Sequence, residues 1–249
     1  MLKRLLLHTY GLSMFTFKFF KRVWFPPYEF GQIKKHFNDL GLKSLPLISV
    51  IGFIMGLILS MQSRPILERF GAESFIPMMV SISVIRELGP VIGALIVAGR
   101  VSSGIGAELG SMRVTEQIDA LEVSAVDPFN YLVVTRVFTC IIILPLLTIY
   151  MDTLAILGAY FAEFVGQTSS WQLYLDSVVS AVTFSDIIPG ISKTSIFGLI
   201  IGIVGSYYGY NTTQGTEGVG KAATVSVVIS SFLIIFIDMI LVKITLMIW

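Results

Sequence analysis

Hydrophobic residues fall into long runs along this chain, and polar residues gather in the short stretches between them. Each run approaches or exceeds the roughly 20 apolar residues that a helix needs to cross a bilayer. Charged residues of the central part are densest in residues 108–130. The pattern predicts five membrane-spanning helices, over residues 45–61, 75–99, 131–164, 187–208 and 223–249.

The composition agrees with a membrane protein. Of the 249 residues, 55% are hydrophobic and 13% are charged, whereas soluble domains carry about 25% charged residues. The mean hydropathy is +0.84. We therefore expect an all-α membrane protein without a soluble domain. The formal net charge of +1 does not point to nucleic-acid binding, and the single cysteine, Cys140, excludes an intrachain disulfide.

The N-terminal segment differs from the rest of the chain. Residues 1–43 hold eight of the seventeen lysines and arginines, interleaved with aromatic residues. Such a basic, aromatic segment is typical of a helix lying in the membrane interface; the alternative is a solvated tail. Pro26 and Pro27 would interrupt the helix. We expect an interfacial helical segment over residues 1–43 and a transmembrane domain over residues 44–249.

The basic residues also predict an orientation. Lysine and arginine are enriched on the cytoplasmic side of membrane proteins, so the N-terminal segment should be cytoplasmic. Five spans then place connections 108–130 and 209–222 inside, and the acidic connection 163–186 and the C-terminus outside. Lys243, near the outer end of the last span, runs against this assignment.

Two ionisable residues inside the spans are the main candidates for function, because such residues are costly in lipid. Glu87 lies in the second span and Lys193 in the fourth, at depths that would let them meet in a shared cavity. The alternatives are a structural ion pair or side chains that extend to the interface, which we expect of Arg86. Asp152 and Asp238 are weaker candidates, better explained as contacts between helices.

The second span and its continuation are rich in small residues. At helical spacing, such residues let helices pack closely in lipid, and they would also tolerate kinks in a moving helix. The residues are Gly89, Gly93, Gly99, Ser102, Ser103, Gly104, Gly106 and Gly110.

The connection between the second and third spans contains a short amphipathic stretch, TEQIDALEV, over residues 115–123. Ile118, Leu121 and Val123 can form one face of a short helix, surrounded by acidic residues. A short helix on the inner side of the membrane suits docking to a cytoplasmic partner.

The stretch GTEGVGKAAT, residues 215–224, nearly matches a nucleotide-binding loop, Gly-x-x-x-x-Gly-Lys-Ser/Thr. Ala222 stands at the final position and has no hydroxyl to bind magnesium. Membrane spans flank the stretch, whereas a phosphate-binding loop joins a strand to a helix. We therefore interpret the match as coincidental, with the glycines forming a tight inner turn and Lys221 following the positive-inside rule.

Two stretches resemble the signatures of a known family. RELGPVIGALIVAGRVSSGIGAELGSMRVTEQIDALEVSAVDP is similar to the central signature of the MlaE-type permeases of ABC lipid transporters. YYGYNTTQGTEGVGKAATVSVVIS is similar to their second signature. The resemblance covers nearly the whole chain. It implies a non-catalytic permease that moves phospholipids between the inner and outer membranes and has no cofactor of its own.

The resemblance also implies partners and a location. It implies a homodimer in the inner membrane, with the N-terminus cytoplasmic and the C-terminus periplasmic. Two cytoplasmic ABC ATPase subunits would bind ATP and Mg²⁺, and a hexamer of MCE-domain proteins would lie on the outer side. A STAS-domain subunit joins some of these systems.

Site residues follow from the resemblance by position. Glu87 matches the acidic residue of the family's pocket, and Lys193 matches its lysine by place in the fourth span. Ile66, Leu67 and Phe70 are candidates for the outer part of the cavity, with core packing as the alternative. The family's coupling helix, which fits the ATPase, matches Thr115, Glu116, Gln117, Ile118, Asp119, Ala120, Leu121 and Glu122.

Three other functions remain open from the residues alone. Glu87, Asp152 and Lys193 could form the proton relay of an ion-coupled secondary transporter. An intramembrane enzyme is less consistent, because the only histidines, His8 and His36, are both N-terminal. The chain could also be a structural anchor for a complex on the outer side.

Overall fold

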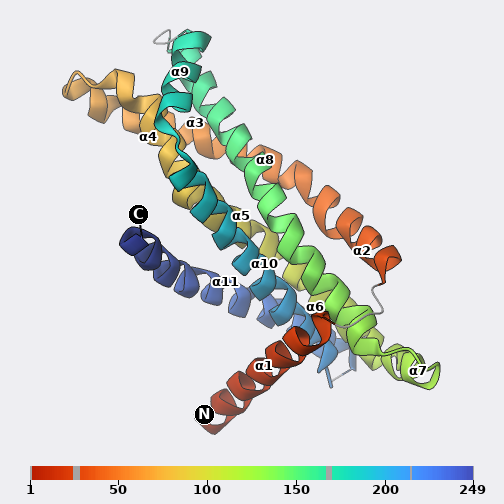
Figure 1. The fold of residues 1–249 in the computed structure, drawn as a ribbon. Helices are drawn as coiled ribbons and strands as arrows, with labels where there is room; N and C mark the ends of the chain where they lie inside the picture. The colour runs from red at the N-terminus through yellow and green to blue at the C-terminus, as the bar shows by residue number, and fades with distance from the viewer. Residues whose placement is uncertain (1, 25–28, 167–169, 214, 249) are drawn as a thin grey trace. The chain divides into compact units, whose positions relative to one another are not determined.

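The computed structural model describes residues 2–24, 29–166, 170–213 and 215–248. Within these ranges every regular element is a helix, which confirms the predicted all-α class (Figure 1). The α-helices are α1 (Leu2–Val23), α2 (Phe30–His36), α3 (Leu45–Arg69), α4 (Ile76–Ser83), α5 (Gly89–Val97), α6 (Ser103–Val114), α7 (Gln117–Val123), α8 (Thr135–Val165), α9 (Trp171–Ala181), α10 (Phe184–Tyr210) and α11 (Gly215–Ile248). Pro26 and Pro27, expected to interrupt the N-terminal helix, lie outside the described residues.

Five helical segments of the described chain are long and apolar enough to cross a membrane, which confirms the predicted number. Each is longer than its predicted run. The segments are Phe30–Arg69, Glu73–Val114, Phe129–Val165, Phe184–Tyr210 and Gly215–Met247.

The first polar break is shorter than predicted. The first span is predicted over residues 45–61, but helix α3 continues to Arg69. Nε of Arg64 lies 2.8 Å from Oε1 of Glu68, one turn further along the helix. Because residues four apart share a helix face, the two charges compensate each other on the helix surface and do not end it.

The connection between the third and fourth spans contains helix α9, which the sequence analysis did not predict. Ser170 caps its N-terminus by accepting a hydrogen bond from the backbone N–H of Leu173 at 3.4 Å. Tyr174 is fully buried, and its hydroxyl donates to the carbonyl oxygen of Ile156 in α8 at 2.9 Å.

The chain divides into two units, which interleave along the sequence. The first unit comprises residues 1–43, 95–144 and 195–237. The second comprises residues 44–94, 145–194 and 238–249. Glu87, Lys193, Asp152 and Asp238 all belong to the second unit.

In the first unit, helix α1 packs one of its faces into a hydrophobic core. Phe15 and Phe19 are buried with Phe129, Val137 and other residues. Nζ of Lys18 lies 4.3 Å from the ring centroid of Phe129, a cation–π contact. The opposite face exposes aromatic residues, as a helix in a membrane interface does.

The small residues of the second span only partly serve close packing. A Cβ atom on Gly106 would lie 3.0 Å from Oγ of Ser226, and one on Gly110 would lie 3.1 Å from Oγ1 of Thr212. In contrast, Gly99 and Gly104 have open space where a Cβ would stand. The prediction of close packing therefore holds for Gly106 and Gly110, but not for the other two.

In the second unit, glycines bring α3 and α8 together. Gly52 and Gly56 lie one turn apart on α3, and a Cβ atom on Gly52 would lie 2.9 Å from the carbonyl oxygen of Met151. A Cβ atom on Gly56 would collide with the backbone of Ala155, and one on Gly158 with the carbonyl of Phe53. Only glycine permits this approach of two helix backbones.

Candidate functional site

A cluster of charged side chains lies inside the second unit. Lys193, on α10, is 3% exposed, and its ammonium group lies 2.8 Å from Oε1 of Glu87. Oδ1 of Asp238, on α11, lies 3.3 Å from the same nitrogen, close enough for an ion pair but without hydrogen-bond geometry. The structure thus brings Glu87 and Lys193 together and adds Asp238 to them.

The backbone around Glu87 departs from the α-helical pattern. Residues Val84–Leu88 form a π-helical stretch, which the backbone N–H of Gly89 closes by donating to the carbonyl of Val84. Pro90 follows and lacks the N–H that would continue the normal α-helical pattern. Such π-helical stretches occur often at functional sites, and here the stretch carries both Arg86 and Glu87.

We expected the side chain of Arg86 to extend to the membrane interface without a partner. The structure instead gives it one. Its guanidinium group forms an ion pair with Asp186, whose side chain is buried. Oδ2 of Asp186 also accepts from the backbone N–H of Thr183 at 2.9 Å and from its hydroxyl at 2.7 Å. Asp186 therefore holds the N-terminus of α10 and Arg86 at the same time.

A pocket of about 290 Å³ lies beside the cluster. Its lining combines charged residues with a few polar and apolar ones from three segments of the second unit. The lining residues are Arg86, Glu87, Ser185, Asp186, Pro189, Lys193, Val242, Thr245 and Leu246.

A second pocket of the same unit is mostly apolar. It measures about 160 Å³, and isoleucines such as Ile85, Ile149 and Ile191 line it together with Asp152. Oδ1 of Asp152 has no hydrogen-bond partner and occupies the place where a Cβ atom on Gly89 would stand. Asp152 therefore makes a contact between helices, as the sequence analysis expected.

Ile66, Leu67 and Phe70 lie at the end of α3 and do not line either pocket. Leu67 packs against the buried cluster that includes Ile76 and Val80, whereas Ile66 and Phe70 are exposed. Their assignment to an outer cavity stays a prediction.

The stretch matched to a coupling helix is helical from Gln117 to Val123. Ile118 is fully buried, and Nη1 of Arg113 lies 2.5 Å from Oδ1 of Asp119. Val123 is 89% exposed, so the prediction that it shares a face with Ile118 is wrong. The reason is its spacing of five residues, which turns it away from Ile118 on a helix of 3.6 residues per turn.

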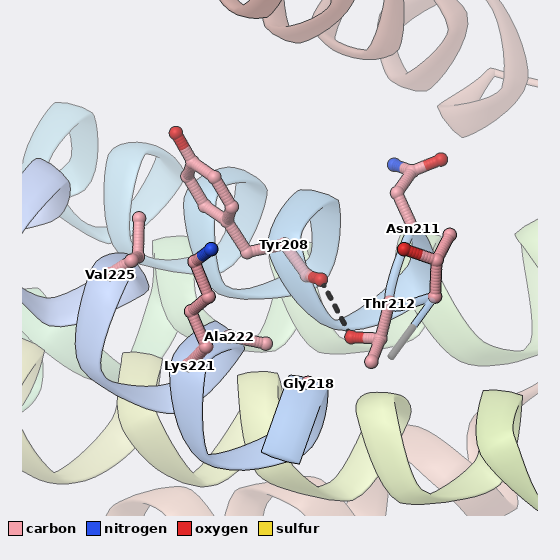
Figure 2. Close-up of a pocket in the computed structure, with 8 residues that line it drawn as sticks. Tyr208, Asn211, Thr212, Gly218, Lys221, Ala222 and Val225 are labelled. Atoms are coloured by element: carbon pink, nitrogen blue, oxygen red, sulfur yellow. Dashed lines mark hydrogen bonds between the residues drawn. The ribbon is translucent and has the colours of Figure 1, made fainter. Parts of the chain in front are cut away.

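The stretch GTEGVGKAAT is helical from Gly215 onward. Gly215 has a positive φ of 57° and supports the turn before α11, but Gly218 and Gly220 lie within the helix, against the expectation of a glycine turn. A pocket of about 390 Å³ lies here. Tyr208 on α10, Thr212 just after that helix, and Lys221 and Ala222 on α11 line it (Figure 2). Gly220 and Lys221 lie beyond the first turn of α11, where backbone N–H groups bond within the helix, so they form no loop that could cradle a nucleotide phosphate.

Asp186 is the functional candidate that the sequence analysis missed. A signal for it was present, because Thr-Phe-Ser-Asp, residues 183–186, has the spacing of a capping box before a helix. The neighbours of Asp238 along the chain give no sign of Lys193, so the sequence alone leaves Asp238 as a weaker candidate. Within the described ranges, no group of three or more His, Cys, Asp or Glu side chains could hold a metal ion.

Comparison with known proteins places the chain in a family. Residues 33–244 match the family model described as Permease MlaE. A probable ABC transporter permease protein of Rickettsia conorii is 40% identical over 225 residues, covering 90% of this chain and 87% of the relative. The intermembrane phospholipid transport system permease protein MlaE of Haemophilus influenzae is 34% identical over 221 residues, covering 84% of each chain. A probable ABC transporter permease protein of a Synechocystis species is 36% identical over 201 residues, covering 81% of this chain and 76% of the relative.

These matches confirm the resemblance on which the sequence analysis relied. An ABC permease works with a partner ATPase and is itself a non-catalytic membrane component. The chain belongs to the MlaE family of ABC transporter permeases.

Proposed function

We propose that this chain is the permease of a transporter that moves phospholipids between the inner and outer membranes. The observation that carries the proposal is the buried ammonium of Lys193, held by Glu87 and Asp238 beside a pocket in the membrane-spanning part. Charged groups at such depth are costly and mark substrate pathways. The name of the Haemophilus influenzae relative, which refers to intermembrane phospholipid transport, supports the choice of substrate.

The proposal includes the assembly and its orientation. Two copies enclose the lipid cavity in the inner membrane, with the N-terminus cytoplasmic and the C-terminus periplasmic. Two ABC ATPase subunits supply ATP and Mg²⁺ from the cytoplasm, an MCE-domain hexamer receives or delivers lipid on the outer side, and a STAS-domain subunit joins as an accessory. Apolar acyl chains enter the cavity because their surface leaves water.

Reconstitution tests this proposal. The permease, purified with its ATPase, is inserted into vesicles, and transfer of a fluorescent phospholipid to acceptor vesicles carrying the MCE-domain protein is measured. We expect transfer that requires ATP and stops when the ATPase is inactivated. Transfer driven by a pH gradient without the ATPase would instead indicate the ion-coupled transporter.

The coupling helix gives a separate prediction. Glu122 is exposed on α7, next to the exposed Val123. We expect Glu122→Lys to weaken association with the ATPase by roughly tenfold, or about 1.4 kcal/mol, because a reversed charge turns attraction into repulsion at an interface. Co-purification of the ATPase at increasing salt measures the effect.

Asp176→Lys is the matched control for Glu122→Lys. Asp176 is an exposed acid on α9, a helix that the proposed orientation places on the opposite side of the membrane. This variant should retain the ATPase. If both variants retain the ATPase equally, α7 is not part of the proposed interface.

A further inference from the structure

The pocket beside Lys193 has an ammonium group that is already neutralised. Lys193 is 3% exposed, and its nitrogen faces Oε1 of Glu87 at 2.8 Å and Oδ1 of Asp238 at 3.3 Å. A buried cation held by two carboxylates has little positive potential left for a third anion. These three side chains together carry one excess negative charge.

The other charged pair at the pocket adds nothing to this balance. Arg86 and Asp186 neutralise each other. The second carboxylate oxygen of Asp186 accepts hydrogen bonds from Thr183. The remaining lining residues are uncharged. Lys243 neighbours Val242 in the sequence but is not among the residues that line the pocket. The five charged groups therefore sum to three carboxylates against two cations.

Two charged groups of the pocket are accessible: the carboxylate of Glu87 and the guanidinium group of Arg86, on consecutive residues of the π-helical stretch. The side chain of Glu87 is 42% exposed and uses Oε1 for Lys193, so its carboxylate stays open to a second cation. The side chain of Arg86 is about half exposed and keeps N–H donors that Asp186 does not take. Guanidinium groups bind phosphate well, and a carboxylate binds an ammonium.

We propose that this pocket selects a zwitterionic phospholipid headgroup, with its ammonium at Glu87 and its phosphate at Arg86, over an anionic one. The inference rests on the proposed lipid transport and adds the substrate class. A headgroup without a cation, such as that of phosphatidylglycerol, would bring a phosphate to a site that already holds an excess negative charge. Repulsion of this kind is how binding sites reject the wrong ligand.

Lipid retention tests the selection. The permease–ATPase complex is placed in nanodiscs of equal phosphatidylethanolamine and phosphatidylglycerol with identical acyl chains. It is then extracted into detergent, and the retained lipids are quantified by mass spectrometry. We expect phosphatidylethanolamine to be enriched about fivefold over the input ratio, the effect of one partly exposed ion pair. Glu87→Gln should bring the enrichment close to one.

Two further variants provide a second test of the excess charge and a control. Asp238→Asn removes one unit of the same excess charge from a different helix, so it should also reduce the enrichment, even if Glu87→Gln does not fold. Glu217→Gln changes an exposed acid of the first unit that does not line the pocket, and it should leave the enrichment unchanged.

The outcomes separate this inference from the proposed function. Equal retention of the two lipids, or an excess of phosphatidylglycerol, by the unaltered complex would overturn the headgroup selection and leave lipid transport standing. Enrichment that survives in both Glu87→Gln and Asp238→Asn would also overturn it. Retention of neither lipid, together with no ATP-dependent transfer, would overturn the proposed function itself.

Discussion

Replacing Lys193 with methionine is expected to lower the free energy of unfolding by about 3 kcal/mol and to abolish lipid transfer. Methionine fills a similar volume but leaves Glu87 and Asp238 as neighbouring carboxylates without their cation. Removing one partner of a buried ion pair costs about 3–5 kcal/mol, and the lower value applies because Glu87 is partly exposed. Thermal unfolding in detergent measures the stability, and the reconstituted system measures transfer.

A triple variant separates stability from function. Replacing the whole cluster, with Lys193→Met, Glu87→Gln and Asp238→Leu, removes the unpaired charges and should recover most of the lost stability. Transfer should remain absent, because the pocket would have lost the acid that receives the headgroup cation. A triple variant that is stable and also transports lipid at the normal rate would show that the cluster contributes to packing and not to transport.

Gly56→Ala is expected to lower the free energy of unfolding by about 3 kcal/mol. A Cβ atom at this position would collide with the carbonyl carbon and oxygen of Ala155 in α8, and backbone atoms cannot move aside as a flexible side chain can. The two helices must therefore separate, which also breaks the contacts at Gly52 and Gly158. The midpoint of unfolding in detergent, followed by circular dichroism, measures the loss.

Gly104→Ala is the matched control for Gly56→Ala. Gly104 also lies in a helix, but apart from the backbone of its own helix no atom stands within 4 Å of a Cβ placed there. Alanine favours a helix over glycine by about 1 kcal/mol, so this variant should be as stable as the unaltered chain or slightly more stable. If both variants unfold at the same midpoint, α3 and α8 do not pack as closely as the structure describes.

The number of spans and the all-helical class follow from the amino-acid sequence alone. Transfer of apolar side chains into lipid is a local property of each segment, so five apolar runs predicted five spans. Local periodicity also located α7, although it placed Val123 on the wrong face. In the same way, the charges inside the spans pointed to Glu87 and Lys193 because their cost in lipid does not depend on the fold.

Which of these charged side chains meet depends on how the helices pack in the folded chain. The contact of Asp238 with Lys193 and the pairing of Arg86 with Asp186 depend on how each helix is rotated about its axis. Hydropathy contains no such information, because a span that is apolar on every side has no preferred inner face. The rotation is set by close contacts such as those of Gly52, Gly56 and Gly89, where the missing Cβ admits a neighbouring helix or side chain. The pairing of these charged side chains therefore depends on how the helices pack, and this packing exists only in the folded chain.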